Sequence, residues 1–302
     1  MTKQRKGYKK LDRDKAIAGY LFTLPSFIGF IIFVLIPLIW AANISLHQYN
    51  VFTGEGTFVG LKNYKSVFAD ARSIVALKNT IWYAVFCTLF NTITGLLLAV
   101  AINDKLSKKI SVFFRAVYFF PSLVGLTFVA VIWQYFFQTD SGVVNYYLGL
   151  LHINKVGWLS NPAFSKISVL ILDTWKNCGL SMLLILAGLQ NISQDLLEAA
   201  SIDGASGIKK FMKITLPLAS PTIFFVLIIN MTGALRLYES SYVLTNGGPG
   251  DSSLSLVMLI AEKAFTSLDY GVATSLSMML LAFIGIVTIV QFVGSRWWVN
   301  YD

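Results

Sequence analysis

Six long apolar stretches divide the chain, and polar segments separate them. They cover about residues 16–42, 80–102, 115–137, 167–189, 217–235 and 269–293. Crossing the hydrocarbon core of a bilayer takes about 20 residues of helix, which each stretch supplies. The apolar positions run continuously instead of alternating, so each stretch predicts a transmembrane helix. We therefore expect an all-α, polytopic membrane protein with six transmembrane helices and both chain ends on the same side.

Composition supports the membrane assignment and argues against a soluble or nucleic-acid-binding protein. The chain has 56% hydrophobic and only 13% charged residues, with a mean hydropathy of +0.67. A soluble fold of 302 residues could not bury that much apolar surface. A net charge of +9 could suggest nucleic acid, but seven of the 24 Lys and Arg residues lie in residues 1–15. We interpret the positive charge as a topology signal and expect no nucleic-acid partner.

The distribution of basic residues orients the chain. Segments 1–15, 103–115, 191–216 and 294–302 hold fifteen Lys and Arg residues, whereas the longer segments 43–79, 138–166 and 236–268 hold eight. Cytoplasmic segments are the ones enriched in Lys and Arg. The prediction is therefore that both ends are cytoplasmic, with a basic tail at 1–15 and one transmembrane domain at 16–302.

The first apolar stretch follows a basic segment, as in a secretory signal peptide. Its length, from Ala16 to about Ala42, exceeds the roughly 7 to 15 apolar residues of a cleaved signal. We expect a retained first transmembrane helix, with kinks at Pro25, Gly29 and Pro37.

The polar interval between the fourth and fifth stretches, residues 190–216, predicts two short helices. Ser193 is suited to cap the first helix and Gly204 to end it, and the second, about 206–214, carries Phe211 among three lysines. Such a pair could lie on the membrane surface, which the lysines favour, or could dock into another protein. The small pair Ala199-Ala200 slightly favours docking, because small residues allow close backbone approach.

At this interval the sequence resembles a known family, the membrane permease subunits of binding-protein-dependent ATP-binding-cassette (ABC) importers. The family pattern is E-A-A, three residues, G, nine residues, I-x-L-P, and it is matched by Glu198-Ala199-Ala200, Gly204, Ile214 and Leu216-Pro217. The sugar branch, of the maltose-permease type, is indicated by Asn79-Thr80, Arg115, Phe120-Pro121, Trp133, Gly188-Leu189-Gln190, Ile202-Asp203-Gly204-Ala205 and Thr245-Asn246-Gly247-Gly248-Pro249. The resemblance extends from about Tyr20 to Arg296.

The resemblance implies a transporter subunit of the bacterial or archaeal cytoplasmic membrane, not an enzyme. Its cytoplasmic loop is a coupling helix that contacts a separate ATPase, and the expected contact residues are Glu198, Ala199, Ala200, Asp203, Gly204 and Phe211. The implied partners are a second homologous permease, two ATPase subunits and an extracytoplasmic solute-binding protein. ATP and Mg²⁺ are expected on the ATPase and no cofactor on this chain, which lacks the G-x-x-x-x-G-K-[ST] phosphate loop.

Polar groups inside the apolar stretches suggest where a substrate passes, since such groups usually face a cavity or a partner. The fourth stretch holds Asp173, Trp175, Lys176, Asn177 and Ser181, and a second set follows at Asn230, Arg236, Tyr238 and Glu239. The resemblance implies that both sets contact a sugar, with a di- or oligosaccharide as the expected cargo. Alternatively, Asp173 and Lys176 neutralise each other on one helix face. Four of these residues are charged, whereas the maltose permease is uncharged in the matching region. The charges are compatible with an acidic sugar or with internal salt bridges, and the four residues are Asp173, Lys176, Arg236 and Glu239.

The outer segment around Gly247, Gly248 and Pro249 is expected to be a flexible turn. The resemblance implies that it contacts the solute-binding protein.

Two other functional classes are weaker alternatives. An ATP-independent secondary transporter or channel predicts inverted repeats or broken helices with midplane charges, which the sequence does not display. An intramembrane enzyme lacks support, because the only histidines, His47 and His152, fall in outer segments away from any serine or cysteine nucleophile.

Overall fold

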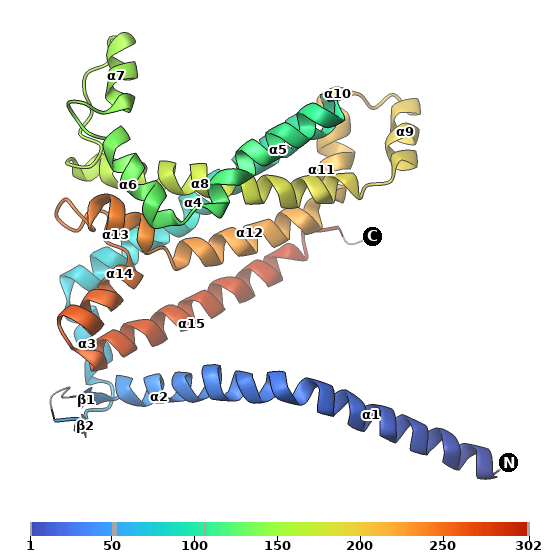
Figure 1. Cartoon of the computed structure of the whole chain (residues 1–302), viewed down its shortest axis with the longest axis horizontal. Helices are drawn as coiled ribbons and strands as arrows, with labels where there is room; N and C mark the ends of the chain where they lie inside the picture. The colour runs from blue at the N-terminus through green and yellow to red at the C-terminus, as the bar shows by residue number, and fades with distance from the viewer. Residues whose placement is uncertain (1, 50–52, 106, 301–302) are drawn as a thin grey trace.

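The computed structural model describes residues 2–49, 53–105 and 107–300 (Figure 1). Its helices are α1 (Thr2–Phe30), α2 (Ile36–Ser45), α3 (Lys62–Ala69), α4 (Ala71–Lys105), α5 (Lys108–Leu123), α6 (Leu126–Phe136), α7 (Val143–Leu150), α8 (Pro162–Gln190), α9 (Gln194–Ile202), α10 (Gly207–Lys210), α11 (Leu216–Leu218), α12 (Ser220–Leu235), α13 (Glu239–Thr245), α14 (Leu256–Ala261) and α15 (Tyr270–Ser295). Three π-helical turns, η1 (Ile31–Leu35), η2 (Phe211–Thr215) and η3 (Glu262–Thr266), continue neighbouring helices. A small antiparallel hairpin pairs β1 (His47–Tyr49) with β2 (Gly56–Phe58), and the all-α fold class is confirmed.

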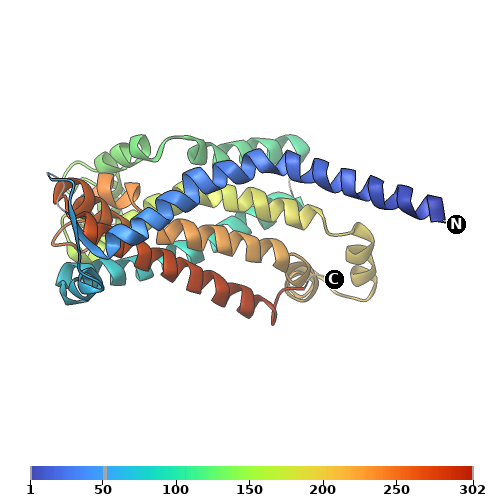
Figure 2. The same cartoon turned by 90° about the horizontal axis from the view of Figure 1, so that it is seen from below.

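The helices account for the predicted membrane spans, with two modifications. Four are continuous and apolar enough to cross a membrane: Lys15–Ser45, Ala71–Asn103, Pro162–Gln190 and Tyr270–Ser295. Two more crossings are bent pairs, Lys109–Leu123 with Leu126–Phe136 at 99° and Gly207–Leu218 with Ser220–Leu235 at 68°. Counting each bent pair as one span gives the predicted six. Both chain ends lie at the end of the bundle that carries α9, opposite the hairpin (Figure 1, Figure 2).

The prediction of one continuous helix over 115–137 was wrong. Helix α5 ends at Leu123, and Val124 is extended, with φ −78° and ψ 138°. Gly125 then precedes α6, which leaves in a new direction. Pro121, in the last turn of α5, has no amide hydrogen to continue the helix ladder. Hydropathy does not detect such a break, because both halves are apolar.

Helix α8 is the centre of the bundle and packs mainly against α4, with α5 and α12 beside it. Three glycines lie at these crossings. A Cβ built on Gly95 of α4 would meet Ser181 Cβ at 2.6 Å, one on Gly179 of α8 would collide with the Tyr118 carbonyl of α5, and one on Gly188 would collide with Thr222 of α12. Small residues let membrane helices approach closely enough for backbone contact. The position of α8 therefore depends on these glycines.

The first membrane helix stands apart from the rest. None of the most apolar part of Lys15–Ser45 is buried within the chain, and its last part, α2, lies against α15, while α1 diverges from the bundle (Figure 1). The residues expected to form a basic tail continue the same helix, since α1 begins at Thr2. Apolar surface on every side suits a helix surrounded by lipid or by another subunit.

The bend before α12 is supported by the far end of α15. Trp298 and Phe292 both pack edge-on against Phe224 of α12, at ring-centroid distances of 6.0 and 5.3 Å. The Asn300 amide donates a hydrogen bond to Ser220 Oγ at 2.9 Å. These contacts fix the start of α12 next to the polar interval.

Candidate functional site

A polar cavity lies between α4, α8, α12 and the start of α13, and we call it the inner cavity. Its volume is about 410 Å³. Six of the nine predicted pathway residues line it, namely Asp173, Asn177, Asn230, Arg236, Tyr238 and Glu239, and they come from both predicted sets. The structure thus brings together two groups that are far apart in the sequence.

Asp173 is the most buried charged group of this cavity. Its two carboxyl oxygens each accept one hydrogen bond, from Asn91 Nδ2 of α4 and from Asn177 Nδ2 of α8, both at 3.0 Å. Asn91 also lines the cavity, and its carbonyl oxygen Oδ1 is buried without a donor among the described residues. An unsatisfied buried acceptor costs about 1–3 kcal/mol, so Asn91 Oδ1 is a position where a ligand hydroxyl would be stabilised.

A second polar cluster continues from Asp173 along the bundle. Asn230 Nδ2 of α12 donates to Thr92 Oγ1 of α4 at 3.0 Å and to Ser181 Oγ of α8 at 3.1 Å. Ser181 is almost fully buried and reaches the inner cavity only through Asn230. Three helices are therefore joined by side-chain hydrogen bonds at the level of the cavity.

Lys176 does not pair with Asp173. Its ammonium Nζ donates to three main-chain carbonyls at the α5–α6 bend, those of Val124 at 2.8 Å, Ser122 at 3.2 Å and Pro121 at 3.4 Å. Carbonyls at a helix end have no partner within the helix, and a cation stabilises them. Lys176 thus stabilises the broken helix, and the described ion pairs do not include it.

Trp175 points to a different part of the bundle. Its ring contacts Trp133 edge-on at 5.7 Å, and it lines a mainly apolar cavity of about 620 Å³ between α4, α5 and α8. Residues at consecutive positions of a helix point about 100° apart, so neighbours of Asp173 in the sequence need not share its cavity. The structure does not bring Trp175 to the other pathway residues.

Arg236, Tyr238 and Glu239 line the outer end of the inner cavity, where α12 gives way to α13. Arg236 is exposed, and its Nε donates to the Thr232 carbonyl at 3.3 Å. Among the described lining residues the cavity has two carboxyl side chains, Asp173 and Glu239, and one guanidinium.

The segment of Gly247, Gly248 and Pro249 connects α13 with α14 on the outer side. It was expected to be flexible, but its continuation is anchored to α4. Asn79 Nδ2 donates to the carbonyls of Asp251 and Leu254, both at 3.0 Å. Glycine and proline indicate a turn, but they do not show whether side chains elsewhere hold it.

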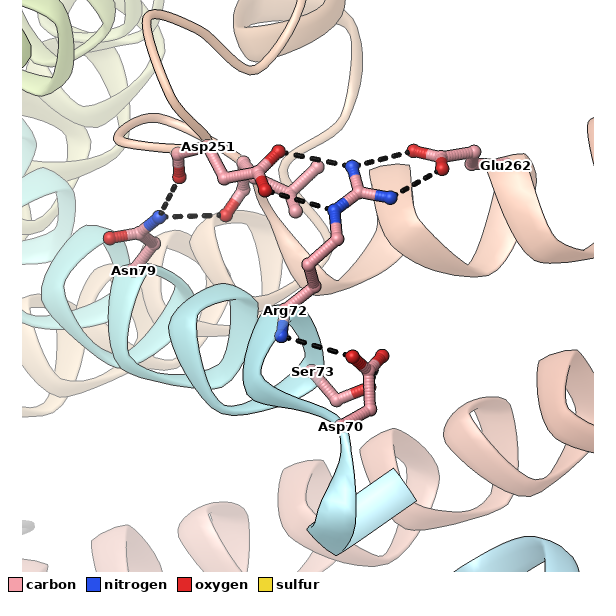
Figure 3. A network of polar contacts seen from close by, with 7 residues as sticks. Asp70, Arg72, Ser73, Asn79, Asp251 and Glu262 are labelled. Atoms are coloured by element: carbon pink, nitrogen blue, oxygen red, sulfur yellow. Dashed lines mark hydrogen bonds and ion pairs between the residues drawn. The ribbon is translucent and has the colours of Figure 1, made fainter. Parts of the chain in front are cut away.

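A charged clamp holds the same segment (Figure 3). The Arg72 guanidinium at the start of α4 bonds Asp251 at 2.9 and 3.0 Å and Glu262 at 2.6 and 3.0 Å. Asp70, just before α4, accepts from the Arg72 amide and from Ser73 Oγ. Burial acts to raise the pKa of Asp70, but these hydrogen bonds together lower it below the ordinary value. Bidentate arginine pairs are geometrically specific, so the clamp fixes how the outer segment sits on α4.

The predicted coupling residues form a protrusion at the opposite end. Helix α9 follows Ser193, whose side chain makes no capping hydrogen bond, and ends before Gly204, whose φ of +82° confirms the glycine stop. Glu198, Ala199 and Asp203 are exposed, whereas Ala200 is buried and Phe211, in η2, is half-buried. Figure 1 shows α9 standing away from the bundle.

The structure adds two features to this protrusion. Ile202 and Ile208 are 87% and 82% exposed, which is unusual for residues outside the bilayer. Lys210 Nζ donates to Ser201 Oγ at 2.9 Å and ties α10 to α9. An exposed apolar surface on a compact helical pair marks an interaction site.

Sequence reasoning missed Asn91 and Thr92. Both lie in the second apolar stretch, and two adjacent polar residues near the middle of a span were the signal that could have identified them.

Comparison with known proteins supports the assignment of this chain to the permease subunits of binding-protein-dependent importers. Residues 91–298 match the family described as "Binding-protein-dependent transport system inner membrane component". The trehalose/maltose transport system permease protein MalF of Thermococcus litoralis is 36% identical over 289 residues, covering 93% of this chain and 94% of that protein. The arabinooligosaccharides transport system permease protein AraP of Bacillus subtilis is 32% identical, covering 95% of this chain and 91% of that protein.

A solved structure has the same fold. A bacterial ABC transporter involved in the import of the acidic polysaccharide alginate contains a chain with a TM-score of 0.81 and 24% identity, covering 96% of this chain and 98% of that one. The apolar helices, the sugar-permease relatives and the family match all indicate a membrane-spanning permease. The chain therefore belongs to the binding-protein-dependent transport system inner membrane components, and it is a multi-pass permease subunit of a sugar ABC importer in the cytoplasmic membrane.

Proposed function

We propose that this subunit forms half of the path for a neutral di- or oligosaccharide. A second, homologous permease completes the path, a solute-binding protein delivers the sugar from outside, and two ATPase subunits bind ATP and Mg²⁺ and drive the cycle. The inner cavity is the site where the sugar is held within the membrane.

The buried acceptor Asn91 Oδ1 is the observation that carries this proposal. It lies beside the Asp173 carboxyl at the inner cavity and has no donor within the described part of the chain. Sugar hydroxyls can donate to Asn91 Oδ1 and to the remaining lone pairs of Asp173, and they can also accept from amides. A cavity whose polar lining includes three amides and a buried carboxyl from three helices suits a ligand with many hydroxyl groups.

The charges of the cavity favour a neutral cargo over an acidic one. Two carboxyl side chains and one guanidinium line it, and the ammonium of Lys176 is engaged by main-chain carbonyls at the α5–α6 bend. An acidic sugar would bring a further carboxylate into surroundings of low dielectric constant where one guanidinium already faces two carboxyl side chains, and an unpaired carboxylate is costly to desolvate. The importer of acidic alginate shares the fold with this chain at 24% identity, which does not carry its cargo over.

The protrusion formed by α9 and α10 is the proposed ATPase contact. Its exposed Ile202 and Ile208 offer apolar surface, and its exposed Glu198 and Asp203 supply a polar rim. Ala200 is buried and Phe211 is half-buried, so these two predicted contact residues offer less surface to a partner than the exposed ones. Because η2 and α11 connect α10 directly to α12, a movement of the protrusion is transmitted to a helix that lines the inner cavity.

Reconstitution tests the proposal. The complete complex, in liposomes with its binding protein, is supplied with neutral and uronic-acid oligosaccharides, and ATP hydrolysis is measured. We expect stimulation by a neutral sugar and none by the uronic-acid series. Stimulation by acidic sugars alone would contradict the neutral cargo, and sugar uptake without any ATPase subunit would favour the secondary-transporter alternative.

A further inference from the structure

A second cavity opens on the outer side, next to the inner one, and we call it the outer cavity. Its volume is about 390 Å³, and its walls come from α13, the end of α14 and η3. None of the predicted pathway residues except Tyr238 lines it. The helices that line it, α13 and α14, lie at the end of the bundle opposite α9 (Figure 1).

One residue borders both cavities. Tyr238 lines both of them, and it stands at the junction where α12 has ended and α13 has not yet begun. Tyr238 therefore lies between the outer cavity and the cavity that contains Asp173.

The outer cavity has an aromatic wall. The rings of Tyr238, which precedes α13, and of Tyr242, on α13, are stacked on each other, with centroids 5.3 Å apart and 11° between their planes. Phe265 of η3, which is 78% exposed, adds a third ring to the lining. Exposed aromatic groups with polar neighbours mark binding sites, and Tyr242 is itself 48% exposed.

The polar groups of the outer cavity are suited to a neutral ligand. Asn246 and Thr266 contribute an amide and a hydroxyl. The only carboxyl among the lining residues, that of Glu262, is occupied, because both of its oxygens bond the Arg72 guanidinium of the clamp (Figure 3). A pyranose ring matches this set, since its flat C–H face covers an aromatic surface while its hydroxyls reach amide and hydroxyl groups.

The clamp gives the outer cavity a rigid base. Arg72 joins Glu262, in the wall of the cavity, to Asp251, beside the segment expected to meet the binding protein. Asn79 adds hydrogen bonds to the carbonyls of Asp251 and Leu254. A site whose walls are held before the ligand arrives loses less conformational entropy on binding.

We propose that the outer cavity is a second sugar subsite, in which Tyr242, backed by Tyr238, stacks on one ring of a neutral oligosaccharide whose leading rings occupy the inner cavity. This inference rests on the proposed sugar-import function. It predicts a dependence on chain length, because only an oligosaccharide long enough to reach past Tyr238 contacts Tyr242.

The test compares Tyr242→Ala with Tyr147→Ala, a matched exposed tyrosine on α7 outside both cavities. ATPase stimulation by the reconstituted complex is titrated with binding protein loaded with a two-ring or a four-ring neutral sugar, and the affinity of the binding protein for each sugar is measured separately. For Tyr242→Ala we expect the half-stimulating concentration to rise about tenfold with the four-ring sugar and to stay unchanged with the two-ring sugar. Tyr242→Phe, which keeps the ring, and Tyr147→Ala should behave as wild type with both.

Three results would overturn the subsite. The first is an equal effect of Tyr242→Ala on both sugar lengths, and the second is no effect on either. The third is loss of the second permease or of bound binding protein from the purified Tyr242→Ala complex, which would identify the tyrosine wall as a protein interface. Failure of the import function itself is distinguishable, since then no sugar of either length stimulates the wild-type complex.

Discussion

Gly179→Ala is a direct test of how closely α5 lies against α8. A Cβ added at this position would collide with the carbonyl oxygen of Tyr118 and lie 2.6 Å from its carbonyl carbon and 2.9 Å from Phe119 Cα. All three atoms belong to the main chain of α5, so no side-chain rotation can relieve the contact. Helix α5 itself must move.

The expected magnitude follows from two opposing effects. Overpacking a well-packed contact costs about 1–3 kcal/mol, whereas alanine gains about 1 kcal/mol over glycine in helix propensity. Gly285→Ala in α15 is the matched control, because its Cβ would meet nothing within 4 Å and its φ is not positive. The control retains only the propensity gain, so the difference between the two variants, about 1–3 kcal/mol, isolates the steric effect.

The assay is thermal unfolding of the full chain in detergent, followed by tryptophan fluorescence and by the fraction that remains monodisperse. Gly179→Ala should unfold at a lower temperature than wild type, and Gly285→Ala at the same or a higher temperature. Equal unfolding temperatures for the two variants would refute the close contact between α5 and α8.

Three further changes test the coupling loop, the inner cavity and the helix bend. Gly204→Asp places a side chain at a φ of +82° and should leave membrane insertion intact while uncoupling ATP hydrolysis from uptake. The control Gly54→Asp, at a φ of +70° on the outer side, should not uncouple them. Normal uptake by the Gly204 variant would refute the docking role of the coupling loop. Asp173→Asn should weaken sugar-stimulated ATPase activity about tenfold without loss of assembly. The control is Asp140→Asn, because the exposed ion pair of Asp140 contributes little. Unchanged stimulation by the true cargo would show that Asp173 is not part of the sugar site. Lys176→Met removes a hydrogen-bond donor that three carbonyls share and should destabilise the chain by about 1.5–3 kcal/mol in thermal unfolding, with partial rescue by Lys176→Arg. Wild-type stability of the methionine variant would show that water replaces the ammonium.

Hydropathy was sufficient to predict the number and order of the membrane segments, because each stretch is apolar throughout. It could not predict where a helix changes direction within a membrane segment. The break at Val124 and Gly125 lies inside an apolar stretch, and only Pro121 and Gly125 hinted at it. The glycine stop at Gly204 was predictable, because a left-handed residue that ends a helix is a local property of the chain.

The site shows the same division between local and tertiary information. Asp173 and Lys176 are near enough on one helix to pair, and local reasoning allowed that pairing. Lys176 instead contacts carbonyls that become available only because α5 ends beside it, 52 to 55 residues earlier in the chain. Asn91 was missed for a related reason, since its role depends on which face of α4 meets α8.

The clamp of Arg72 also bears on biogenesis. Its carboxyl partners lie 179 and 190 residues further along the chain, so most of the protein must be synthesised before the guanidinium can engage either of them. During that interval Arg72 remains at the outer end of α4, where water can hydrate it at little cost. The outer cavity can therefore form only late in synthesis, and a chain arrested before Glu262 emerges would have five of its six spans and its coupling loop, but neither α15 nor a receiving site on the outer side.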